Sequence, residues 1–480
     1  MDFHEDTFKN RLILVSNREP YIHEKTIRGI RCKQAIGGLV SALDPVMQSY
    51  KGTWVAWGSG GADREVCDDE DRVEVPPDNP QYKLKRVWLS EREKNYYYRG
   101  FCNRVLWPLS HLFLGKVSFE EKYWKAYKKV NAKFTKAVFQ EATSQDVIWV
   151  HDYHLSLVPS LIKKDRSDSI VTYFWHIPWP PWEVYRILPW RREILGSLLC
   201  SDLIGFHTQR YVKNFKVCAE KEFDASVNND TITVGDHDTT VKAFPLGIDY
   251  KKFNSISSSK KAAIAARRLR GKLHANTLIL GVDRLDYTKG ILDRLAAFER
   301  FLEKYPRYRE KVVFVQIATP SRTKVKEYRL LKREVDEMVG RINGRFQRLD
   351  WVPIRYFYRS FTHEQLIAYY RAADIAFVTP LIDGMNLVAK EYMASKGTED
   401  GVLILSEFAG AAEEMTEALL INPHDTRGVV YAIKKALEMS SRERKSRSEA
   451  LRNKIRTHDL DWWLDSFFSE VIKVQDNPHG

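Results

Sequence analysis

The residues best suited to chemistry in this sequence are cations that follow buried, strand-like segments. In the second half, Arg284 and Lys289 follow the apolar segment TLILGV and precede the helical pattern GILDRLAAFERFL. Two cations beside a helix N-terminus, where backbone N–H groups point outward, are suited to binding a diphosphate. The sequence contains neither G-x-x-x-x-G-K-[ST] nor G-x-G-x-x-G, which removes the main support for ATP or nicotinamide binding. We therefore expect the diphosphate to belong to another kind of ligand.

A carboxylate stands in an unexpected place in the stretch LIDGMNLVAKEYMASKG. Asp383 and Gly384 are a turn and N-cap signal, and the pattern after them predicts a helix on which Glu391 shares the face of Leu387 and Val388. An unpaired carboxylate on an apolar face is costly. Either a buried salt bridge to a lysine or arginine or a bound ligand would explain it.

The ligand explanation has a definite geometry. Asp383 and Glu391 are eight residues apart, which is about 12 Å of helix. That length is similar to the distance across a diphosphate from a sugar to a nucleoside ribose. Asp383 would then hold sugar hydroxyls, the backbone N–H groups from Gly384 to Leu387 would hold the diphosphate, and Glu391 would hold the ribose hydroxyls.

Candidates in the first half also stand at strand ends. Arg18 follows RLILVSN and the next helix pattern begins near Gly38, so an arginine and backbone N–H groups could meet an anion; a tight turn with a surface arginine is the alternative. Asp152 in VHDYH and His176 in YFWHIPWPP follow two further runs. In the second half Arg322 ends the run QIATPSR. No H-E-x-x-H pattern is present, so we expect no metal site at the histidines.

The elements that position these residues can be read from the hydrophobic pattern. Strand-like runs such as DVIWVHD, DLIGFHT, KVVFVQIATPSR and GVLILSEFAG alternate with amphipathic helical patterns. Such alternation predicts an α/β fold of βαβ units, with parallel sheets covered by helices on both faces. A Ser-rich and then highly charged stretch follows Gly247, where we place a domain junction. Ligands of such doubly wound halves bind beyond the carboxyl ends of the strands.

Composition limits the class of protein. The 480 residues carry a formal net charge of +13, which favours anionic partners such as phosphorylated small molecules. The basic residues are mixed with acidic ones and accompany no helix-turn-helix, zinc-finger or RNP pattern, so we expect no nucleic-acid partner. No apolar run reaches about 20 residues and the first residues lack a signal-peptide core, so we expect a cytoplasmic protein without a membrane partner. Five cysteines without a C-x-x-C pair are expected to be free thiols.

The motifs and their order resemble those of the trehalose-6-phosphate synthase family, which consists of retaining glycosyltransferases of the two-domain GT-B fold. The motifs that carry the resemblance are LVSNREP, IGGLV, WVAWGSG, NYYYRGFCNRVLWPLSH, WVHDYH, HIPWP, DRLDYTKG, IATPSR, GRINGRF, TPLIDGMNLVAKEY and LSEFAGAAEE. The chain departs from the family pattern at Trp179, where many members have Phe, and at the REP that follows Asn17.

The resemblance implies an architecture and a set of contacts. Residues 1–247 would form an acceptor-binding Rossmann-like domain, 248–458 a nucleotide-sugar-binding one facing it across a cleft, and 459–480 a helix crossing back to the first domain. The acceptor, glucose 6-phosphate, would contact Arg18, Tyr98, Trp107, Asp152 and Arg322. The nucleotide-sugar donor would contact Gly38, His176, Arg284, Lys289, Asp383, Gly384, Met385, Asn386, Leu387, Val388 and Glu391.

The implied activity is transfer of glucose from UDP-glucose, or another nucleoside diphosphate glucose, to glucose 6-phosphate, giving α,α-trehalose 6-phosphate. A front-face reaction is expected, in which the leaving diphosphate takes the proton of the acceptor. The residues expected to act in catalysis are His176, Arg284, Lys289 and Asp383, with no metal or cofactor required. No phosphatase domain follows, so the product should stay phosphorylated. A glucosylglycerol-phosphate synthase and a catalytically silent sugar-phosphate-binding subunit are the alternatives, and a homo-oligomer is compatible with each.

Overall fold

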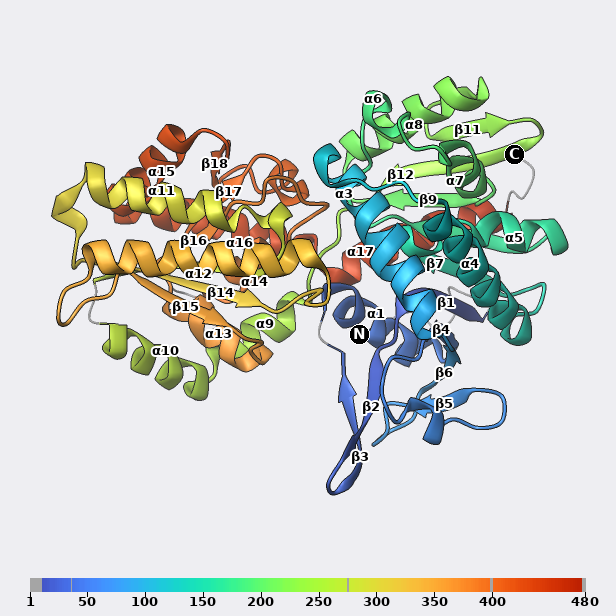
Figure 1. Ribbon diagram of the computed structural model, residues 1–480, viewed down its shortest axis with the longest axis horizontal. Coiled ribbons are helices and arrows are strands. Elements are labelled where there is room, and N and C mark those ends of the chain that lie inside the picture. Colours follow the sequence, from blue (N-terminus) through green and yellow to red (C-terminus); the bar gives the residue numbers. More distant parts are fainter. Residues whose placement is uncertain (1–10, 36, 274–275, 398–399, 477–480) are drawn as a thin grey trace. The chain divides into compact units, whose positions relative to one another are not determined.

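The structure is a computed structural model that describes residues 11–35, 37–273, 276–397 and 400–476. The chain divides into two compact units: unit 1 is Met1–Phe244 together with Leu464–Gly480, and unit 2 is Pro245–Trp463. Both units are mixed α/β structures (Figure 1). None of the described helices is long and apolar enough to cross a membrane.

Unit 1 is built on a mixed sheet of ten described strands in the order β10-β11-β12-β9-β8-β7-β1-β4-β6-β5. The centre, from β12 to β6, is parallel. The edge strands β5, β10 and β11 pair antiparallel, and β2 and β3 form a separate antiparallel hairpin. The strands are β1 (Leu12–Arg18), β2 (Tyr21–Thr26), β3 (Gly29–Gln34), β4 (Thr53–Trp57), β5 (Arg72–Val75), β6 (Tyr82–Val87), β7 (Val147–His151), β8 (Ile170–Phe174), β9 (Leu203–Phe206), β10 (Ser226–Asn228), β11 (Thr231–Val234) and β12 (His237–Ala243).

The sequence predicts the parallel centre of this sheet but not its edges. The central strands β1, β7, β8 and β9 are almost wholly buried, which gives the continuous apolar runs that identify them. The strands β3 and β10 are mostly exposed and polar. A strand that buries little leaves no apolar run in the sequence, so the hairpin and the antiparallel edges were not predictable from that pattern.

Helices cover the sheet of unit 1 (Figure 1). Helix α1 contacts β1 and β6, and α4 contacts β1, β4 and β6. The apolar side of α17 lies on the sheet, where Phe467 stacks on Trp149 of β7 with ring centroids 4.7 Å apart. The helices are α1 (Gly38–Tyr50), η1 (Asp63–Glu65), α2 (Glu91–Glu93), the π-helix η2 (Lys94–Leu106), α3 (Trp107–Ser110), η3 (Leu114–Lys116), α4 (Glu121–Glu141), η4 (Tyr153–Leu155), α5 (Val158–Asp165), α6 (Trp182–Tyr185), α7 (Arg191–Leu198), α8 (Gln209–Phe223) and α17 (Leu460–Asp476).

Unit 2 is built on a sheet of six described strands, all parallel, in the order β15-β14-β13-β16-β17-β18. The strands are β13 (Thr277–Arg284), β14 (Val312–Thr319), β15 (Ile354–Tyr358), β16 (Ile375–Val378), β17 (Val402–Ser406) and β18 (Leu419–Ile421). The helices are α9 (Tyr250–Ser258), α10 (Lys260–Leu273), η5 (Tyr287–Lys289), α11 (Ile291–Lys304), η6 (Pro306–Tyr308), α12 (Lys326–Phe346), α13 (His363–Ala372), α14 (Leu387–Ala394), η7 (Gly410–Glu413), α15 (Thr426–Glu438) and α16 (Ser441–Thr457).

The core of unit 2 includes one apolar face of the helix that the pattern GILDRLAAFERFL predicts. Ile291, Leu295, Phe298 and Leu302 of α11 are each at most 1% exposed and belong to one apolar cluster with the strands. Helix α11 packs beside α12 and α15, whereas α13 packs beside α10 and α14, so helices lie on both faces of the sheet (Figure 1). Burial of both sheet faces explains why these strands read as unbroken apolar runs.

Each main sheet has a point at which the strand order reverses. In unit 1 the chain moves outward from β1 through β4 to β6 on one side and from β7 through β8 to β9 on the other. In unit 2 the corresponding pair is β13 and β16. Loops that leave neighbouring parallel strands in opposite directions open a crevice at the carboxyl edge, where ligands of α/β proteins bind. Of the predicted site residues, Arg18, Asp152, Arg284 and Asp383 end or follow these four strands, whereas His176 follows β8 and Arg322 follows β14.

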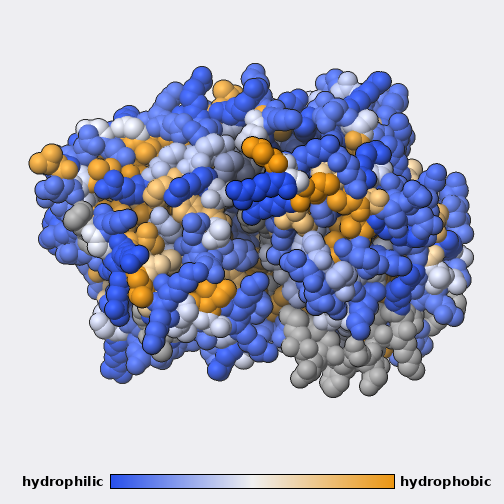
Figure 2. Space-filling view, turned by 90° about the horizontal axis from the view of Figure 1, so that it is seen from below, coloured by the Kyte–Doolittle hydropathy of each residue, from blue (hydrophilic) through white to orange (hydrophobic). Residues whose placement is uncertain are grey.

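The face of the protein shown in Figure 2 is mostly hydrophilic, with hydrophobic residues in scattered patches between charged ones. Large apolar side chains that are strongly exposed include Ile27 of the β2–β3 hairpin and Leu349. Single exposed apolar residues are ordinary on a globular protein. The high charge content of the sequence therefore reads as a solvated surface.

Candidate functional site

The half-site of unit 2 lies where β13 and β16 diverge. Arg284 ends β13, and η5 leads from it into α11. The Lys289 ammonium pairs with Asp383, in the loop after β16, with 2.6 Å between Nζ and Oδ2. The Leu381 N–H donates to the Thr288 carbonyl at 2.8 Å, which ties the two loops together. Two of the predicted site residues, Lys289 and Asp383, are thus in contact.

Asp383 is also fixed from the side of α14. Asn386 Nδ2 donates to Asp383 Oδ2 at 2.9 Å, and Asn386 Oδ1 accepts from the Ala389 N–H at 3.2 Å. Asn386 is therefore the N-cap of α14, in a left-handed conformation with φ of 81°. The prediction that Asp383 and Gly384 cap this helix is wrong, because the cap lies closer to the helix and the Asp383 carboxylate turns to Lys289.

The start of α14 changes the geometry expected for a diphosphate. The helix begins at Leu387, so the helical rise applies only from there to Glu391. The expected distance of about 12 Å between Asp383 and Glu391, which assumes eight helical residues, therefore does not hold. The loop before the helix is fixed by backbone pairing with residues 408–411. The backbone N–H groups from Gly384 to Leu387 still stand at a helix N-terminus, which suits an anion.

Glu391 shares a face of α14 with Leu387 and Val388, as predicted, but that face is partly exposed. The Tyr370 hydroxyl donates to Glu391 Oε2 at 2.8 Å. Loss of water around the carboxyl group raises the pKa of Glu391, and the Tyr370 hydroxyl opposes this rise. Among the described residues no lysine or arginine forms a salt bridge with Glu391. A buried salt bridge therefore does not explain this carboxylate.

The charged residue that α14 buries is Lys390, which the sequence analysis misses. Lys390 is 2% exposed; its Nζ lies 2.6 Å from Glu414 Oε2 and donates to the Leu246 carbonyl at 2.8 Å. Burial lowers the pKa of Lys390, and Glu414 opposes the change. Because one residue turns a helix by about 100°, Lys390 points into the unit while the next residue does not.

A second residue missed by the sequence analysis, Arg294 of α11, connects the strand ends of this half-site. The guanidinium is 1% exposed and donates to Asp283 Oδ2 at 2.5 Å, to Thr379 Oγ1 at 2.9 Å and to the Lys289 carbonyl at 3.2 Å. It thereby holds the loop that carries Lys289. Its signal in the sequence is an arginine three residues after Ile291, on the face of α11 that is otherwise apolar.

Arg322 is held by a buried carboxylate. Its Nη1 lies 2.6 Å from Asp286 Oδ2 and 2.5 Å from the Tyr328 hydroxyl, and its side chain is 5% exposed. Burial alone would raise the pKa of Asp286, but Arg322, Arg284, the Thr288 N–H and Lys289 together hold the pKa below its usual value. The backbone of Arg322 is left-handed, with φ of 47°. Arg322 and Arg284 therefore share one charged neighbourhood with Asp286 in unit 2.

The half-site of unit 1 lies where β1 and β7 diverge. Arg18 ends β1, and its Nη2 donates to the Tyr98 hydroxyl at 3.0 Å. Tyr98 lies in the π-helix η2, and its ring stacks on His154 with 5.9 Å between centroids. π-Helices occur often at functional sites. Arg18 and Tyr98, predicted for the acceptor, are thus brought together from segments 80 residues apart.

Asp152 follows β7 directly and joins this group. Its Oδ1 accepts from the His176 N–H at 3.3 Å, and its Oδ2 lies 3.6 Å from His154 Nδ1. The Tyr173 hydroxyl donates to the Asp152 carbonyl at 2.6 Å. The φ of Asp152 is 69°, a positive value that is uncommon outside glycine and concentrates at functional sites.

His176 follows β8 and is partly exposed. Its Nε2 lies 3.0 Å from His151 Nδ1, so one of the two nitrogens donates to the other. Burial, with His207 and His151 nearby, holds the pKa of His176 well below its usual value, and burial lowers the pKa of His151 to about 3. Both imidazoles are therefore neutral at pH 7. A neutral imidazole can exchange hydrogen bonds with a sugar hydroxyl.

Two further predicted residues, Trp107 and Gly38, lie in unit 1 outside the group around Arg18, Tyr98 and Asp152. Trp107 is 4% exposed, and its ring lies 4.1 Å from His111 and 5.9 Å from Tyr153 between centroids. Tyr153 adjoins His154 and so links Trp107 to the ring on which Tyr98 stacks. Gly38 is exposed at the start of α1 and offers its backbone N–H.

Comparison with known proteins places the chain in a family. The sequence model described as glycosyltransferase family 20 matches residues 10–473. The chain belongs to glycosyltransferase family 20. The predicted family is therefore confirmed, and with it the α/β GT-B fold class.

Members of family 20 resemble the chain along nearly its whole length. A bifunctional trehalose-6-phosphate synthase/phosphatase of Thermoproteus tenax is 42% identical over 476 residues, covering 97% of this chain, which spans 64% of that relative's length. The UDP-forming α,α-trehalose-phosphate synthase of Pichia angusta is 38% identical, with 97% and 100% covered. The crystal structure of a UDP-forming synthase from Burkholderia xenovorans in complex with glucose-6-phosphate is 33% identical, with a TM-score of 0.87 over 96% of this chain and 100% of that one.

The two departures from the family 20 pattern both lie in buried surroundings. Trp179 is 1% exposed; its Nε1 donates to Cys218 Sγ at 3.4 Å, and its ring packs edge-on against Phe215. Glu19, in the REP segment, is 1% exposed and pairs with Arg86 at 2.9 Å. Each departure therefore has a matched partner within unit 1.

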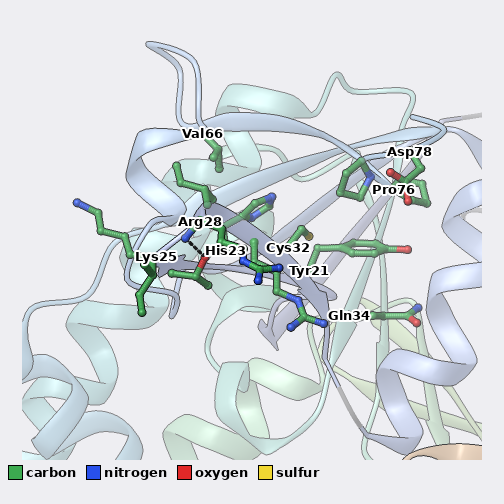
Figure 3. Close-up of a pocket in the computed structure, with 14 residues that line it drawn as sticks. Tyr21, His23, Lys25, Arg28, Cys32, Gln34, Val66, Pro76 and Asp78 are labelled. Carbon is green, nitrogen blue, oxygen red and sulfur yellow. Dashed lines mark hydrogen bonds between the residues drawn. The ribbon is translucent and has the colours of Figure 1, made fainter.

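A cavity of about 1330 Å³ in unit 1 shares no residue with the predicted site of this family 20 chain (Figure 3). The hairpin of β2 and β3 forms one wall, and Val66 and Pro76 to Asp78 face it. Its walls carry the cations Lys25, Arg28 and Arg31.

No group of three or more His, Cys, Asp or Glu side chains in the described residues is arranged to hold a metal ion.

Proposed function

We propose that the chain is a retaining glucosyltransferase that moves glucose from UDP-glucose to glucose 6-phosphate and forms α,α-trehalose 6-phosphate and UDP. The observation that carries the proposal is the Lys289–Asp383 pair beside Arg284 at the strand-order reversal of unit 2. Membership of family 20 supports it, as do the names of relatives that are UDP-forming trehalose-phosphate synthases. The cytoplasm is the proposed location, which fits five cysteines without a disulfide.

Each unit would bind one substrate. In this proposal unit 2, near the predicted domain 248–458, binds the nucleotide sugar, and unit 1, near the predicted domain 1–247, binds the acceptor, with 459–480 returning to it. Lys289 and Arg284 would face the diphosphate, Asp383 the sugar hydroxyls and Glu391 the ribose hydroxyls. The Tyr370 hydroxyl holds the Glu391 carboxylate and would orient it for the ribose.

The acceptor would be held mainly by groups of unit 1. A phosphate is a dianion near neutral pH, and arginine suits it because its planar guanidinium can donate two parallel hydrogen bonds. Arg18, already oriented by Tyr98, would take the phosphate. The ring of Trp107 would border the sugar. Asp152 would accept hydrogen bonds from sugar hydroxyls.

In the proposed reaction the bond from the donor's anomeric carbon to the diphosphate oxygen breaks, and a bond to the acceptor's anomeric oxygen forms on the same face. The acceptor proton passes to the departing diphosphate, so no protein base is needed. Arg284 and Lys289 stabilise the negative charge that grows on the diphosphate. Asp383 is already bonded to Lys289 and Asn386, which suits it to orient the sugar. Neutral His176 would hold a sugar hydroxyl.

The test is a product analysis with the purified full chain. Glucose 6-phosphate and glycerol 3-phosphate are each incubated with a panel of nucleoside diphosphate glucoses, with and without EDTA, and products are identified by mass spectrometry and NMR. We expect a phosphorylated, non-reducing disaccharide from glucose 6-phosphate, with activity largely kept in EDTA. A glucosylglycerol phosphate would favour the alternative acceptor. Absence of any phosphorylated glycoside with every donor would contradict the proposal.

A further inference from the structure

Two successive residues at the end of β1 point in opposite directions. Arg18 is exposed and meets Tyr98, whereas Glu19 is 1% exposed. The Glu19 carboxylate accepts hydrogen bonds from the Ser59 N–H at 2.7 Å, the Ser59 hydroxyl at 2.9 Å and Arg86 Nε at 2.9 Å. Because adjacent residues share a peptide unit, anchoring Glu19 also fixes the backbone from which the Arg18 side chain extends.

Arg86 of β6 is the centre of the buried network. Its guanidinium is 1% exposed and has a partner on each nitrogen. Besides Glu19, it donates to the Asp63 carbonyl at 2.9 Å, to the Tyr21 carbonyl at 3.1 Å and to His23 Nδ1 at 2.9 Å. Asp63 Oδ1 lies 3.0 Å from Nη2. The network therefore joins the end of β1 to β2, β6 and the loop after β4.

Asp63 closes the network against the hairpin of β2 and β3. Its carboxylate accepts from the His23 N–H at 2.8 Å and from the Gly60 N–H at 2.5 Å. A Cβ at Gly60 would lie 2.4 Å from the His23 carbonyl, so only glycine fits this approach. Tyr21 and His23 of β2 also line the wall of the cavity (Figure 3).

Burying the charged groups of this network costs free energy. Burial raises the pKa of Glu19 to about 8, because Arg86 only partly offsets the loss of water and Asp63 adds to the rise. Buried ion pairs often contribute little net stability compared with apolar side chains of similar volume. Their best-supported use is to specify one geometry. The geometry specified here is that of the residue next to Glu19, which is Arg18.

We propose that Glu19 and Arg86 are positioning residues that hold Arg18 in the orientation in which it binds the phosphate of the acceptor. This inference rests on the proposed function. Neither residue touches substrate; both act through Arg18. The geometry also assigns a role to the REP segment, in which arginine is the ligand-binding residue, glutamate is its anchor, and the chain then enters β2.

The test is a double-mutant cycle between Glu19 and Arg18 in the full chain. Glu19→Leu should raise the KM for glucose 6-phosphate about 10-fold, with kcat and the KM for UDP-glucose within twofold. Glu19→Gln, which keeps an oxygen for the Ser59 N–H, should restore much of this loss. In the Arg18→Ala background the same Glu19→Leu change should alter kcat/KM less than twofold, because the residue it positions is gone. An equal loss in both backgrounds would overturn the proposal.

A matched control separates positioning from stability. Glu141 is buried at the carboxyl end of α4 and pairs with Arg72 Nε of β5 at 2.7 Å. Its partner Thr53 begins β4, at the amino end of the strands, far along the sheet from Arg18. Glu141→Leu should lower the melting temperature as Glu19→Leu does, with the KM for glucose 6-phosphate unchanged. A similar rise in KM for both variants would mean that lost stability, not positioning, is measured.

Hydrogen exchange gives a readout that does not depend on turnover. Glu19→Leu should speed amide exchange in the peptides that contain residues 17–21 and 58–63, and Glu141→Leu should leave those peptides unchanged. Unchanged exchange in Glu19→Leu would overturn the proposal, whatever the enzyme does. If the wild type makes no sugar phosphate product while this exchange result is obtained, the proposed function fails but the anchoring of Arg18 stands.

Discussion

The two half-sites are built from different interactions. In unit 2 the predicted residues are held by ion pairs, with Lys289 on Asp383 and Arg322 on Asp286. In unit 1 they are held by hydrogen bonds between rings and polar groups, such as Arg18 on Tyr98. Charges that are already fixed cost little reorganisation when a diphosphate leaves, whereas a sugar needs aromatic rings and neutral donors. The difference matches one site that stabilises charge and one that recognises shape.

Replacing Lys289 in the ion-paired half-site of unit 2 should cause the largest loss of activity. We expect Lys289→Ala to lower kcat about 100- to 1,000-fold, the effect typical of losing one group that stabilises charge in the transition state. Lys304→Ala, at the exposed far end of α11, the helix that follows Lys289, is the control and should change kcat less than twofold. Steady-state kinetics with saturating substrates measure both. A Lys289→Ala enzyme with full kcat would show that the diphosphate binds elsewhere.

Replacing Arg322, which is held in an ion pair, should affect both the use of the acceptor and the stability of the protein. Arg322→Ala should lower kcat/KM for glucose 6-phosphate about 10- to 150-fold, from a loss of about 1.5 to 3 kcal/mol of charge-assisted hydrogen bonding. It should also lower the free energy of unfolding by about 1.5 to 3 kcal/mol, because the buried Asp286 loses its salt bridge but keeps the hydrogen bonds from the Tyr328 hydroxyl and the Thr288 N–H. Kinetics and urea unfolding separate the two. Unaltered unfolding would mean that Asp286 does not depend on this pair.

Replacing Arg18 should affect the use of the acceptor but not the stability of the protein. Arg18→Ala should lower kcat/KM for glucose 6-phosphate about 10- to 150-fold, for the same reason. The Arg18 side chain is exposed, so the free energy of unfolding should hardly change. The preference for glucose 6-phosphate over glucose should narrow, because the lost contact is the one that distinguishes them. Full retention of that preference would place the phosphate elsewhere.

Glu391 tests a residue of unit 2 that is not held by an ion pair, since it has no cation partner among the described residues. Glu391→Gln should weaken UDP binding about 10-fold, because a hydrogen bond from a ribose hydroxyl to a charged group is worth about 1.5 kcal/mol or more. Its melting temperature should stay near that of the wild type. Isothermal calorimetry with UDP measures the change; unchanged affinity with a large loss of stability would assign Glu391 a structural role.

The neutral histidines of unit 1 predict a dependence of stability on pH. The pKa of His151 is about 3 when folded, below its ordinary value of 6.5, so the unfolded chain binds more protons between these values. This contribution is complete above pH 6.5 and is lost as the pH falls, by about 1.4 kcal/mol per pH unit. His151→Asn should flatten that slope. Urea unfolding at pH 7.5, 6 and 5 tests it, and parallel slopes for both proteins would contradict it.

The sequence predicts the residues at strand ends better than the residues that hold them. Lys289 and Asp383 could be found because each follows an apolar run, and the strand order then brings the runs together. Arg294 and Arg86 could not be assigned roles, because their partners lie on other strands at distances in sequence that no local pattern encodes. The cap of α14 was misassigned because Asp383 and Asn386 are both good N-cap residues, and only tertiary contact with Lys289 decides between them.

The most direct test of the central claim, that unit 2 binds the donor and unit 1 the acceptor, is a pair of affinities measured on two variants. Calorimetry with UDP and the KM for glucose 6-phosphate are determined for Lys289→Ala and Arg18→Ala. We predict that UDP affinity falls at least about 10-fold in Lys289→Ala and stays within about twofold in Arg18→Ala, with the opposite pattern for glucose 6-phosphate. Equal weakening of both ligands in both variants would contradict the account.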